Sequence, residues 1–304
     1  MKKMNLRYRP DLSRYYDGLS LAAAIIAIYF AYQAFLAGGY WRPVGFVFGF
    51  GAALIAYGMF AAPKRLVVSR YREKLVHKPE TWLRLVFASD FHTGEFKRAE
   101  WYEKVVLEIQ ALDPDVIFLG GDYVEFEVES IGALESLKKL HAHLGKYFIL
   151  GNHDYLDRPQ DVRNFLSGLG FADLTNGHLT LKKEGRYLQI SGLDDCWQGH
   201  PEIPPIRAAE HLPHITFTHD PDAVLDFSAG DTDLLVCGHT HGGQIRLPVL
   251  GSLLPIPTKL GRAADKGRKI VNAIPLIVSS GCGESEVRAR LFNPAEIVVV
   301  ELGI

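Results

Sequence analysis

The chain has 304 residues, which is enough for one large domain or two small ones with a sizeable buried core. Hydrophobic residues make up 48% and charged residues 22% of it, which excludes a disordered or fibrous protein. Residues 1–62 hold six Lys or Arg and two Asp, a formal charge of +4, so residues 63–304 carry −6 and the whole chain −2. This distribution gives no sign of a polyanion-binding groove, and we expect no nucleic-acid partner.

The three cysteines, Cys196, Cys237 and Cys282, form no paired framework and no C-x-x-C motif. A disulfide scaffold or a zinc knuckle is therefore not indicated. We expect buried, reduced thiols.

Two long uncharged segments lie near the N-terminus. Residues 19–38 contain no charge, and at about 1.5 Å per residue they match the roughly 30 Å hydrocarbon core of a bilayer. A second uncharged run covers residues 44–62 after a link so short that the two helices must be antiparallel. Tyr40 and Trp41 lie at the turn, at the depth where aromatic rings prefer the membrane interface. The pattern predicts a transmembrane helical hairpin over residues 19–62.

The basic residues around this hairpin predict its orientation. Five Lys or Arg precede the first span, one lies between the spans and five follow the second. By the positive-inside rule both ends are cytoplasmic, with a basic N-terminus over residues 1–18 and a basic linker over residues 63–80. The alternatives are a cleaved secretory signal, which would lack the second span, and a buried helical hairpin in a soluble fold.

Beyond the linker, short β-rich runs alternate with amphipathic stretches. Helical periods cover residues 98–112 and 131–144, and residues 179–193 are typical of a β-hairpin that turns at Glu184 and Gly185. The alternation predicts an α/β sandwich with sheets inside and helices outside. Buried strands are expected at residues 83–89, 116–120, 147–150, 214–218, 234–237, 276–279 and 296–302.

Polar residues that can bind metal follow five of these strands. In chain order they are Asp90-x-His92, Gly121-Asp122, Gly151-Asn152-His153-Asp154, His219 and Gly238-His239-x-His241. In α/β sheets the carboxyl ends of strands open onto the ligand crevice. The sequence therefore predicts that these side chains meet at one place.

Together the five blocks resemble those of the calcineurin-like metallophosphoesterase superfamily, D-x-H, G-D, G-N-H-D/E, H and G-H-x-H, over about residues 83–302. Any single block is a weak signal, but all five occur in order with every ligand residue present. The opening SDFHTG and the extended GHTHGGQIRLP are similar to a subgroup of bacterial membrane-associated or exported phosphoesterases. The resemblance implies a four-layer αββα sandwich over a catalytic domain of residues 81–304, in a multi-pass protein of the bacterial inner membrane.

Two divalent ions are implied by the resemblance. It assigns Asp90, His92 and His241 to one ion and Asn152, His219 and His239 to the other, with Asp122 bridging them. Carboxylate, imidazole and amide ligands suit Mn²⁺, which we expect, or Zn²⁺ or Fe²⁺, rather than Ca²⁺. Two such ions ready a hydroxide for attack and neutralise the phosphoryl oxygens.

Two further residues are expected to act in catalysis. In the family His153 faces the scissile bond, where an imidazole can protonate the leaving group. Asp154 is the expected partner that orients this ring.

Other polar residues have simpler interpretations. Histidines without a motif are expected at the surface or in the core. Asp194 and Asp195 either support the site or cap a turn, with neither favoured. The basic segment Lys259–Lys269 is a solvated loop, or it touches anionic headgroups or a substrate phosphate. The histidines concerned are His141, His143, His178, His200, His211 and His214.

These observations lead to a membrane-anchored phosphoesterase that hydrolyses a phosphodiester or pyrophosphate. An anchor concentrates the enzyme near lipid, so a lipid-linked substrate such as UDP-2,3-diacylglucosamine is the favoured hypothesis. The alternatives are a general phosphodiesterase on soluble substrates, a nuclease of the same superfamily and a non-catalytic membrane scaffold. We expect membrane lipids as partners and no protein partner.

Overall fold

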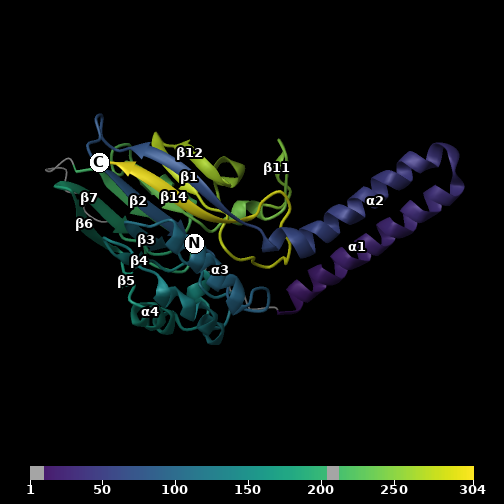
Figure 1. The fold of residues 1–304 in the computed structure, drawn as a ribbon, viewed down its shortest axis with the longest axis horizontal. Helices are drawn as coiled ribbons and strands as arrows, with labels where there is room; N and C mark the ends of the chain where they lie inside the picture. The colour runs from purple at the N-terminus through teal and green to yellow at the C-terminus, as the bar shows by residue number, and fades with distance from the viewer. Residues whose placement is uncertain (1–9, 204–211) are drawn as a thin grey trace.

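The computed structural model describes residues 10–203 and 212–304, so the first nine residues of the expected N-terminal segment and His211 lie outside the described residues. Two six-stranded sheets pack face to face (Figure 1). The first sheet has the order β1 (Leu66–Lys74), β14 (Ala295–Gly303), β2 (Trp82–Ala88), β3 (Val116–Leu119), β4 (Lys146–Phe148) and β5 (Ala172–Asp173). The second has the order β12 (Gly267–Val271), β13 (Ile274–Val278), β9 (Leu234–Cys237), β8 (His214–Phe217), β7 (Arg186–Gly192) and β6 (Gly177–Lys183).

Three apolar cores hold these layers together. Between the sheets, the rings of Phe118 on β3 and Phe217 on β8 stack with centroids 3.6 Å apart. The outer face of the first sheet packs against α3 (Ala99–Ala111), α4 (Pro159–Gly168) and the 3-10 segment η4 (Val128–Lys139). The outer face of the second sheet is covered in the described residues by the short 3-10 helices η6 (Pro221–Asp226) and η8 (Gly261–Ala264). The expected four-layer sandwich is confirmed, although one outer layer is thin.

All seven expected strands and the expected hairpin are present, and α3 lies within the first expected helix. The second expected helix, residues 131–144, is wrong, because this region forms the 3-10 segment η4, which ends at Lys139. Ser130 bonds outside the segment, to Thr93, and Gly132 lowers the helix propensity of the next turn. Tertiary contacts therefore override the helical period.

The expected linker, residues 63–80, is also wrong in part. Leu66–Lys74 form β1, an edge strand paired in parallel with β14 from Leu66 opposite Ala295 to Lys74 opposite Gly303. The strand is only partly buried and carries four charged side chains, as is common where a sheet edge meets water. Its high content of charged residues therefore led to the incorrect prediction of a linker.

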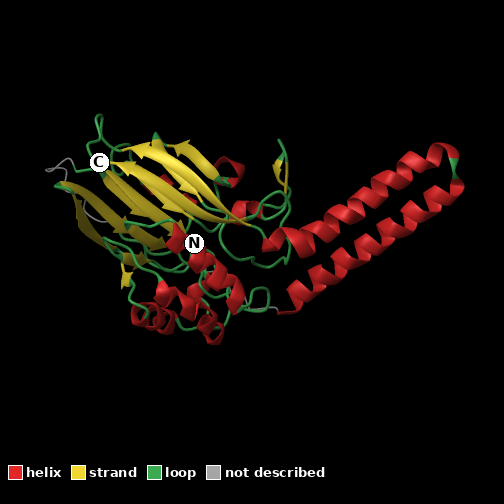
Figure 2. Ribbon diagram, in the orientation of Figure 1, coloured by secondary structure: helices red, strands yellow, loops and turns green. Residues whose placement is uncertain are grey.

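Before this strand, the chain forms a long helical hairpin that projects from the sandwich (Figure 2). Its first arm is α1 (Pro10–Ala37), which begins earlier than expected and so takes in part of the predicted N-terminal segment. A short 3-10 turn η1 (Gly39–Trp41) leads into α2 (Arg42–Ala56), which continues as a π-helix (Tyr57–Ala61) and a 3-10 turn η3 (Ala62–Lys64). By length and composition two helices, Asp17–Ala37 and Gly39–Lys64, could cross a membrane.

A close approach of backbones holds the two arms together. A Cβ added at Gly45 would lie 3.0 Å from the carbonyl oxygen of Ala31, so only glycine fits there comfortably. The outward side chains are apolar and exposed, among them Val47 at 71% and Phe50 at 65%. These faces have no covering partner among the described residues.

Candidate metal centre

The loops that follow the strands of both sheets converge on one buried site. Asp90 and His92 follow β2, and Asp122 follows β3, all in the first sheet. From the second sheet, His219 follows β8, while His239 and His241 follow β9. All seven expected metal ligands, including Asn152 after β4, are at most 7% exposed. The structure therefore brings side chains scattered over some 150 positions into a common interior.

One group consists of Asp90, His92 and His241, whose potential ligand atoms lie within 4.8 Å of one another. The Nε2 atoms of the two imidazoles are 2.9 Å apart. The carboxylate oxygen Oδ1 of Asp90 is 3.5 Å from Nε2 of His241. On the far side of the first ring, Nδ1 of His92 lies against a carboxylate, so its ring proton belongs there and Nε2 faces the group.

The second group consists of Asp122, His219 and His239, again with ligand atoms within 4.8 Å. Nδ1 of His219 donates to the carbonyl of Gly120 at 2.8 Å, which leaves the lone pair of Nε2 facing the group. Nε2 of His239 lies 3.2 Å from the carbonyl of Pro257, and its Nδ1 lies 3.2 Å from Nε2 of His219. Because carbonyls only accept, both imidazoles present a lone pair to each other.

Asp122 stands between the two groups. Its Oδ2 atom is 3.1 Å from Nε2 of His219 in one group and 3.4 Å from Nε2 of His92 in the other. Burial raises the pKa of its carboxyl, but the neighbouring imidazoles of His219 and His153 outweigh burial and hold this pKa well below its usual range. A charged carboxylate shared by two sets of imidazoles is the expected form of a bridging ligand.

The backbone at these ligands is strained. Asp90, His92, Asp122, His239 and His241 have φ angles of 54°, 46°, 55°, 68° and 50°, in the left-handed region that non-glycine residues rarely adopt. Each such residue costs on the order of 1–3 kcal/mol, and such residues cluster at functional sites. That five residues of one proposed site share this uncommon conformation supports a functional role for their placement.

The donor set fits divalent cations. Lone pairs of imidazole and carboxylate point at one another across distances of about 3 Å, an arrangement that repels unless a cation or proton lies between them. Burial lowers the pKa of His92, but the adjacent carboxylate of Glu125 outweighs it and raises this pKa to about 9. Oδ1 of Asn152 is a buried acceptor with no hydrogen-bond partner among the described residues. Nitrogen and oxygen ligands of this kind suit Mn²⁺, Zn²⁺ or Fe²⁺.

His153 lies at the rim of this site, where its side chain is 16% exposed. Its ring packs edge-on against that of His92 with centroids 4.7 Å apart. Its Nδ1 donates to the carbonyl of Glu125 at 2.6 Å, which leaves Nε2 as the unprotonated nitrogen of the neutral ring. The backbone N–H of His153 also donates to Oδ1 of Asp122 at 2.8 Å. The ring is therefore held beside the proposed metal ligands in a fixed tautomer.

Asp154 does not orient this ring, which corrects our expectation. Its Oδ2 accepts from the backbone N–H groups of Asp122 and Gly151, each at 2.9 Å, and its Oδ1 accepts from those of Tyr123 at 2.8 Å and Val124 at 3.4 Å. The carboxylate therefore fixes the loops after β3 and β4 to each other. Burial, with a further contribution from the charge of Asp122, raises the pKa of Asp154 to about 7.

Glu125 is the residue that our sequence analysis missed. Its Oε2 lies 2.5 Å from Nδ1 of His92, and its Oε1 accepts from the hydroxyl of Ser285 and the backbone N–H of Glu286, each at 3.1 Å. A carboxylate behind a ligating imidazole fixes the tautomer and raises the basicity of the ligand. Its position three residues after Asp122, in the same strand-end loop, was the only available signal.

The two aspartates left open by the sequence cap a turn. Oδ1 of Asp195 accepts from the backbone N–H groups of Trp197 and Gln198 at 2.9 and 2.7 Å, and Asp194 accepts from those of Asp195 and His200. The turn lies beside the site, since the ring of Trp197 is 5.1 Å from that of His239. Both aspartates therefore cap the turn, and the Asp195 carboxyl, whose buried Oδ2 has no hydrogen-bond partner among the described residues, is also close enough to His219 and His239 to interact with their charge.

The described histidines without a motif belong to neither group of proposed metal ligands. His141, His143, His178 and His200 are exposed, whereas His214 is buried and bonds to Ser191 and the carbonyl of Asp231. The cysteines are free, as expected; Cys237 and Cys282 are buried, whereas Cys196 is only half-buried.

The basic segment Lys259–Lys269 is only partly a loop, and most of its cations form ion pairs. It contains η8 and the start of β12. Most of its cations are paired: Lys266 lies 3.5 Å from Glu296, Arg268 lies 2.6 Å from Glu73 and Lys269 lies 3.2 Å from Asp265. A role for these three side chains in binding phosphate is therefore not supported.

Comparison with known proteins agrees with the fold and the site. The chain belongs to the calcineurin-like phosphoesterase family, whose family model matches residues 83–243, just over half of the chain. The expected superfamily and enzyme class are confirmed: the chain is a metal-dependent phosphoester hydrolase.

Three relatives illustrate this membership. The uncharacterized metallophosphoesterase YkuE of Bacillus subtilis is 30% identical over 226 residues, which cover 72% of this chain and 78% of that protein. Phosphodiesterase YaeI of Escherichia coli is 28% identical over 67% of this chain and 75% of its own length. A zebrafish protein named as a transmembrane protein with a metallophosphoesterase domain is 30% identical over 83% of this chain and 60% of that protein.

Replacement of the carboxylate behind His92 tests its part in metal binding. We expect Glu125→Gln to lower divalent-metal affinity by about 10–100-fold, because a neutral amide polarises the imidazole less than a carboxylate does. Calorimetric titration of the metal-free protein with Mn²⁺ measures this. The matched control is Glu127→Gln, an exposed glutamate two residues away, which should bind Mn²⁺ like the parent. Equal affinities for both variants would contradict the assignment.

Removal of the Asp154 carboxylate tests its part in joining two loops. We expect Asp154→Ala to destabilise the metal-free chain by about 1–3 kcal/mol, because it strands buried backbone donors. Thermal unfolding in detergent measures this loss. The exposed Asp161, replaced in the same way, should change stability by no more than about 0.5 kcal/mol. An unchanged unfolding temperature for Asp154→Ala would show that its hydrogen bonds stabilise nothing.

Proposed function

We propose that the site holds two divalent metal ions and hydrolyses a phosphodiester or pyrophosphate bond. One ion is assigned to Asp90, His92 and His241, the other to Asn152, His219 and His239. Asp122 bridges them. The observation that carries this proposal is the position of Asp122 Oδ2 between imidazoles of both groups, 3.1 and 3.4 Å away. When bound, two such ions lower the pKa of water and neutralise charge on phosphate. We propose Mn²⁺ as the native metal.

His153 is proposed to handle the leaving group. Its tautomer is set by the carbonyl of Glu125, and its ring stands at the open edge of the site. In its protonated form the ring can donate from Nε2 to the departing oxygen. Asp154 contributes indirectly, because it fixes the loop that carries His153.

A lipid-linked substrate is the favoured class within this chemistry. Two helices long and apolar enough to cross a membrane precede the catalytic domain, and one relative is named as a transmembrane protein. An enzyme held at a bilayer meets lipid-linked esters at high local concentration. We therefore propose a membrane hairpin in the bacterial inner membrane over residues 19–62, with the catalytic domain on the cytoplasmic side, and a substrate of the class of UDP-2,3-diacylglucosamine.

Removal of single ligands tests the catalytic proposal. In the presence of Mn²⁺, Asp122→Ala and His239→Ala should lose hydrolysis of bis-p-nitrophenyl phosphate to background, whereas His153→Ala should retain its metal and lose about 10²–10⁴ in kcat. The exposed His178→Ala is the matched control and should keep full activity. A chelator should abolish the parent's activity, and Mn²⁺ should restore it. Full activity in either ligand variant would refute the metal assignment.

Product analysis tests the lipid-linked substrate. The full chain in detergent with Mn²⁺ should release UMP from UDP-2,3-diacylglucosamine, and it should do so faster than it hydrolyses soluble diesters. His153→Ala should slow both reactions, because the same site carries them. Turnover of soluble diesters without UMP release would identify a general phosphodiesterase instead.

Reporter fusions test the proposed topology. Five basic residues flank each outer end of the hairpin and one lies at its turn, so both termini should be cytoplasmic. Alkaline phosphatase fused at either terminus should be inactive in a bacterial host, whereas a fluorescent protein at the same positions should be bright. The reverse pattern at the C-terminus would place the catalytic domain outside the cytoplasm.

A further inference from the structure

A cluster of exposed apolar side chains stands at one end of the sandwich. It surrounds the small two-stranded ribbon of β10 (Arg246–Leu247) and β11 (Gly251–Ser252). Val249 is fully exposed, Leu250 is 63% exposed and Phe292, from a neighbouring loop, is 52% exposed. We call the cluster the apolar tip, and its members are Pro248, Val249, Leu250, Leu253, Leu254 and Phe292.

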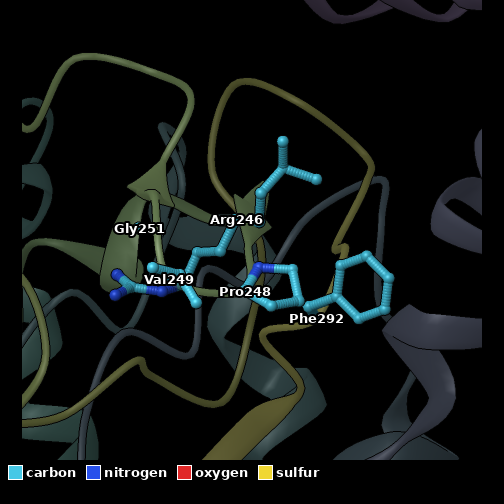
Figure 3. A pocket seen from close by; sticks show the side chains of 6 residues that line it. Arg246, Pro248, Val249, Gly251 and Phe292 are labelled. Atoms are coloured by element: carbon cyan, nitrogen blue, oxygen red, sulfur yellow. The ribbon is translucent and has the colours of Figure 1, made fainter.

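Part of the apolar tip is hollow. Pro248, Phe292, Val249 and Arg246 are among the residues that line an open hollow of about 400 Å³. In Figure 3, Pro248 and Phe292 lie next to each other, with Val249 and Arg246 close by. Val249 has a φ of 69°, which a β-branched residue adopts only under strain. A strained, exposed and apolar turn does not stabilise the fold by itself. Strained and exposed apolar segments of this kind are typical of binding surfaces.

The apolar tip belongs to the same loop as two proposed metal ligands. Its ribbon starts just after His241, where Arg246 donates to the carbonyl of Gly242 and pairs with Asp265, each at 2.8 Å. The loop then returns to the site, where the carbonyl of Pro257 lies 3.2 Å from Nε2 of His239. An occupant of the tip is therefore one loop away from the metal ligands.

The apolar tip also adjoins the base of the helical hairpin. The backbone N–H of Arg246 donates to the carbonyl of Leu291 at 2.9 Å, so the loop of Phe292 runs beside the ribbon. One residue earlier, Arg290 donates its backbone N–H to the carbonyl of Gly58 in the hairpin, also at 2.9 Å. In Figure 1, β11 stands at the end of the sandwich from which α2 emerges. The tip therefore lies beside the base of the apolar helices.

Exposed cations flank the apolar tip and the base of the hairpin. Lys64 and Arg65 lie at the base of the hairpin, and Arg262 donates to the carbonyl of Ser252 on β11 at 2.7 Å. Apolar side chains surrounded by Lys and Arg match a bilayer with anionic headgroups, where each exposed cation near the surface adds attraction. This combination of apolar and cationic side chains favours a lipid surface over a purely apolar protein partner as the occupant of the tip.

We infer that the apolar tip inserts into the headgroup and upper acyl region of the bilayer, beside the helical hairpin. The inference rests on the proposed membrane hairpin and deepens it. The catalytic domain lies against the membrane, and the loop that carries His239 and His241 faces lipid. A lipid-linked phosphate ester can then reach the metal ligands without leaving the bilayer.

Depth-dependent quenching tests this inference on the full chain in nanodiscs of phosphatidylcholine and phosphatidylglycerol. Bimane attached to Val249→Cys should be quenched at least twofold by lipids with a nitroxide near the headgroup. The matched control is Ile270→Cys, on β12, where the parent side chain is 64% exposed, and it should be unaffected. Val47→Cys in α2 reports on the hairpin itself and should be quenched by nitroxides deep in the bilayer.

The outcomes separate the two proposals, and none depends on enzyme activity. Quenching at position 47 but not at 249 overturns the inference and leaves the membrane hairpin intact. No quenching at either position overturns both. A doubled mass in detergent that Val249→Asp abolishes would show that the apolar tip binds a second copy of the chain, and this too would overturn the inference.

A second measurement gives the functional consequence. Val249→Asp should lower the rate on a lipid-embedded p-nitrophenyl phosphodiester at least tenfold and leave the rate on soluble bis-p-nitrophenyl phosphate unchanged. Ile270→Asp should change neither rate. Equal rates of Val249→Asp and parent on the lipid substrate would show that the apolar tip does not present substrate.

Discussion

The carboxylate of Asp122 is the group on which the rest of the site depends. One of its oxygens faces imidazoles of both ligand groups. The other oxygen accepts a hydrogen bond from the backbone N–H of His153. Burying so much negative and lone-pair density is costly unless opposite charge compensates it. The surrounding loops are held by backbone hydrogen bonds to Asp154, so the site can keep these acceptors close before any cation arrives.

The packing of the two sheets determines how the ligands meet. Asp90 and Asp122 extend the first sheet, whereas His219 and His239 extend the second. The side chains between the sheets, with the aromatic rings of β2, β3 and β8 stacked on one another, set the distance between the two sets of strand ends. The backbone N–H of His239 then donates to the carboxylate oxygen Oδ1 of Asp90 at 2.9 Å, which joins the sheets at the site itself. The geometry of the proposed metal site therefore depends on core packing, because a shift of one sheet relative to the other would separate the proposed ligands.

Much of this could be predicted from sequence, because buried strands appear as short apolar runs and strand ends converge in α/β folds. The proposed ligand residues could be named from their motifs. What could not be predicted depends on long-range pairing: β1 carries too many charges to be recognised without its partner β14. Likewise, Glu125 and Asp154 are defined by atoms they reach across loops, namely a ring of His92 and backbone amides, which no local pattern encodes.

The junction between the hairpin and the sheet has a mechanical consequence. Only Arg65 separates the last 3-10 turn of the hairpin from β1, and β1 pairs along its full length with β14. A connection this short restricts rotation of the hairpin relative to the sandwich. The direction of the two helices therefore also determines the orientation in which the catalytic domain presents its site to a substrate.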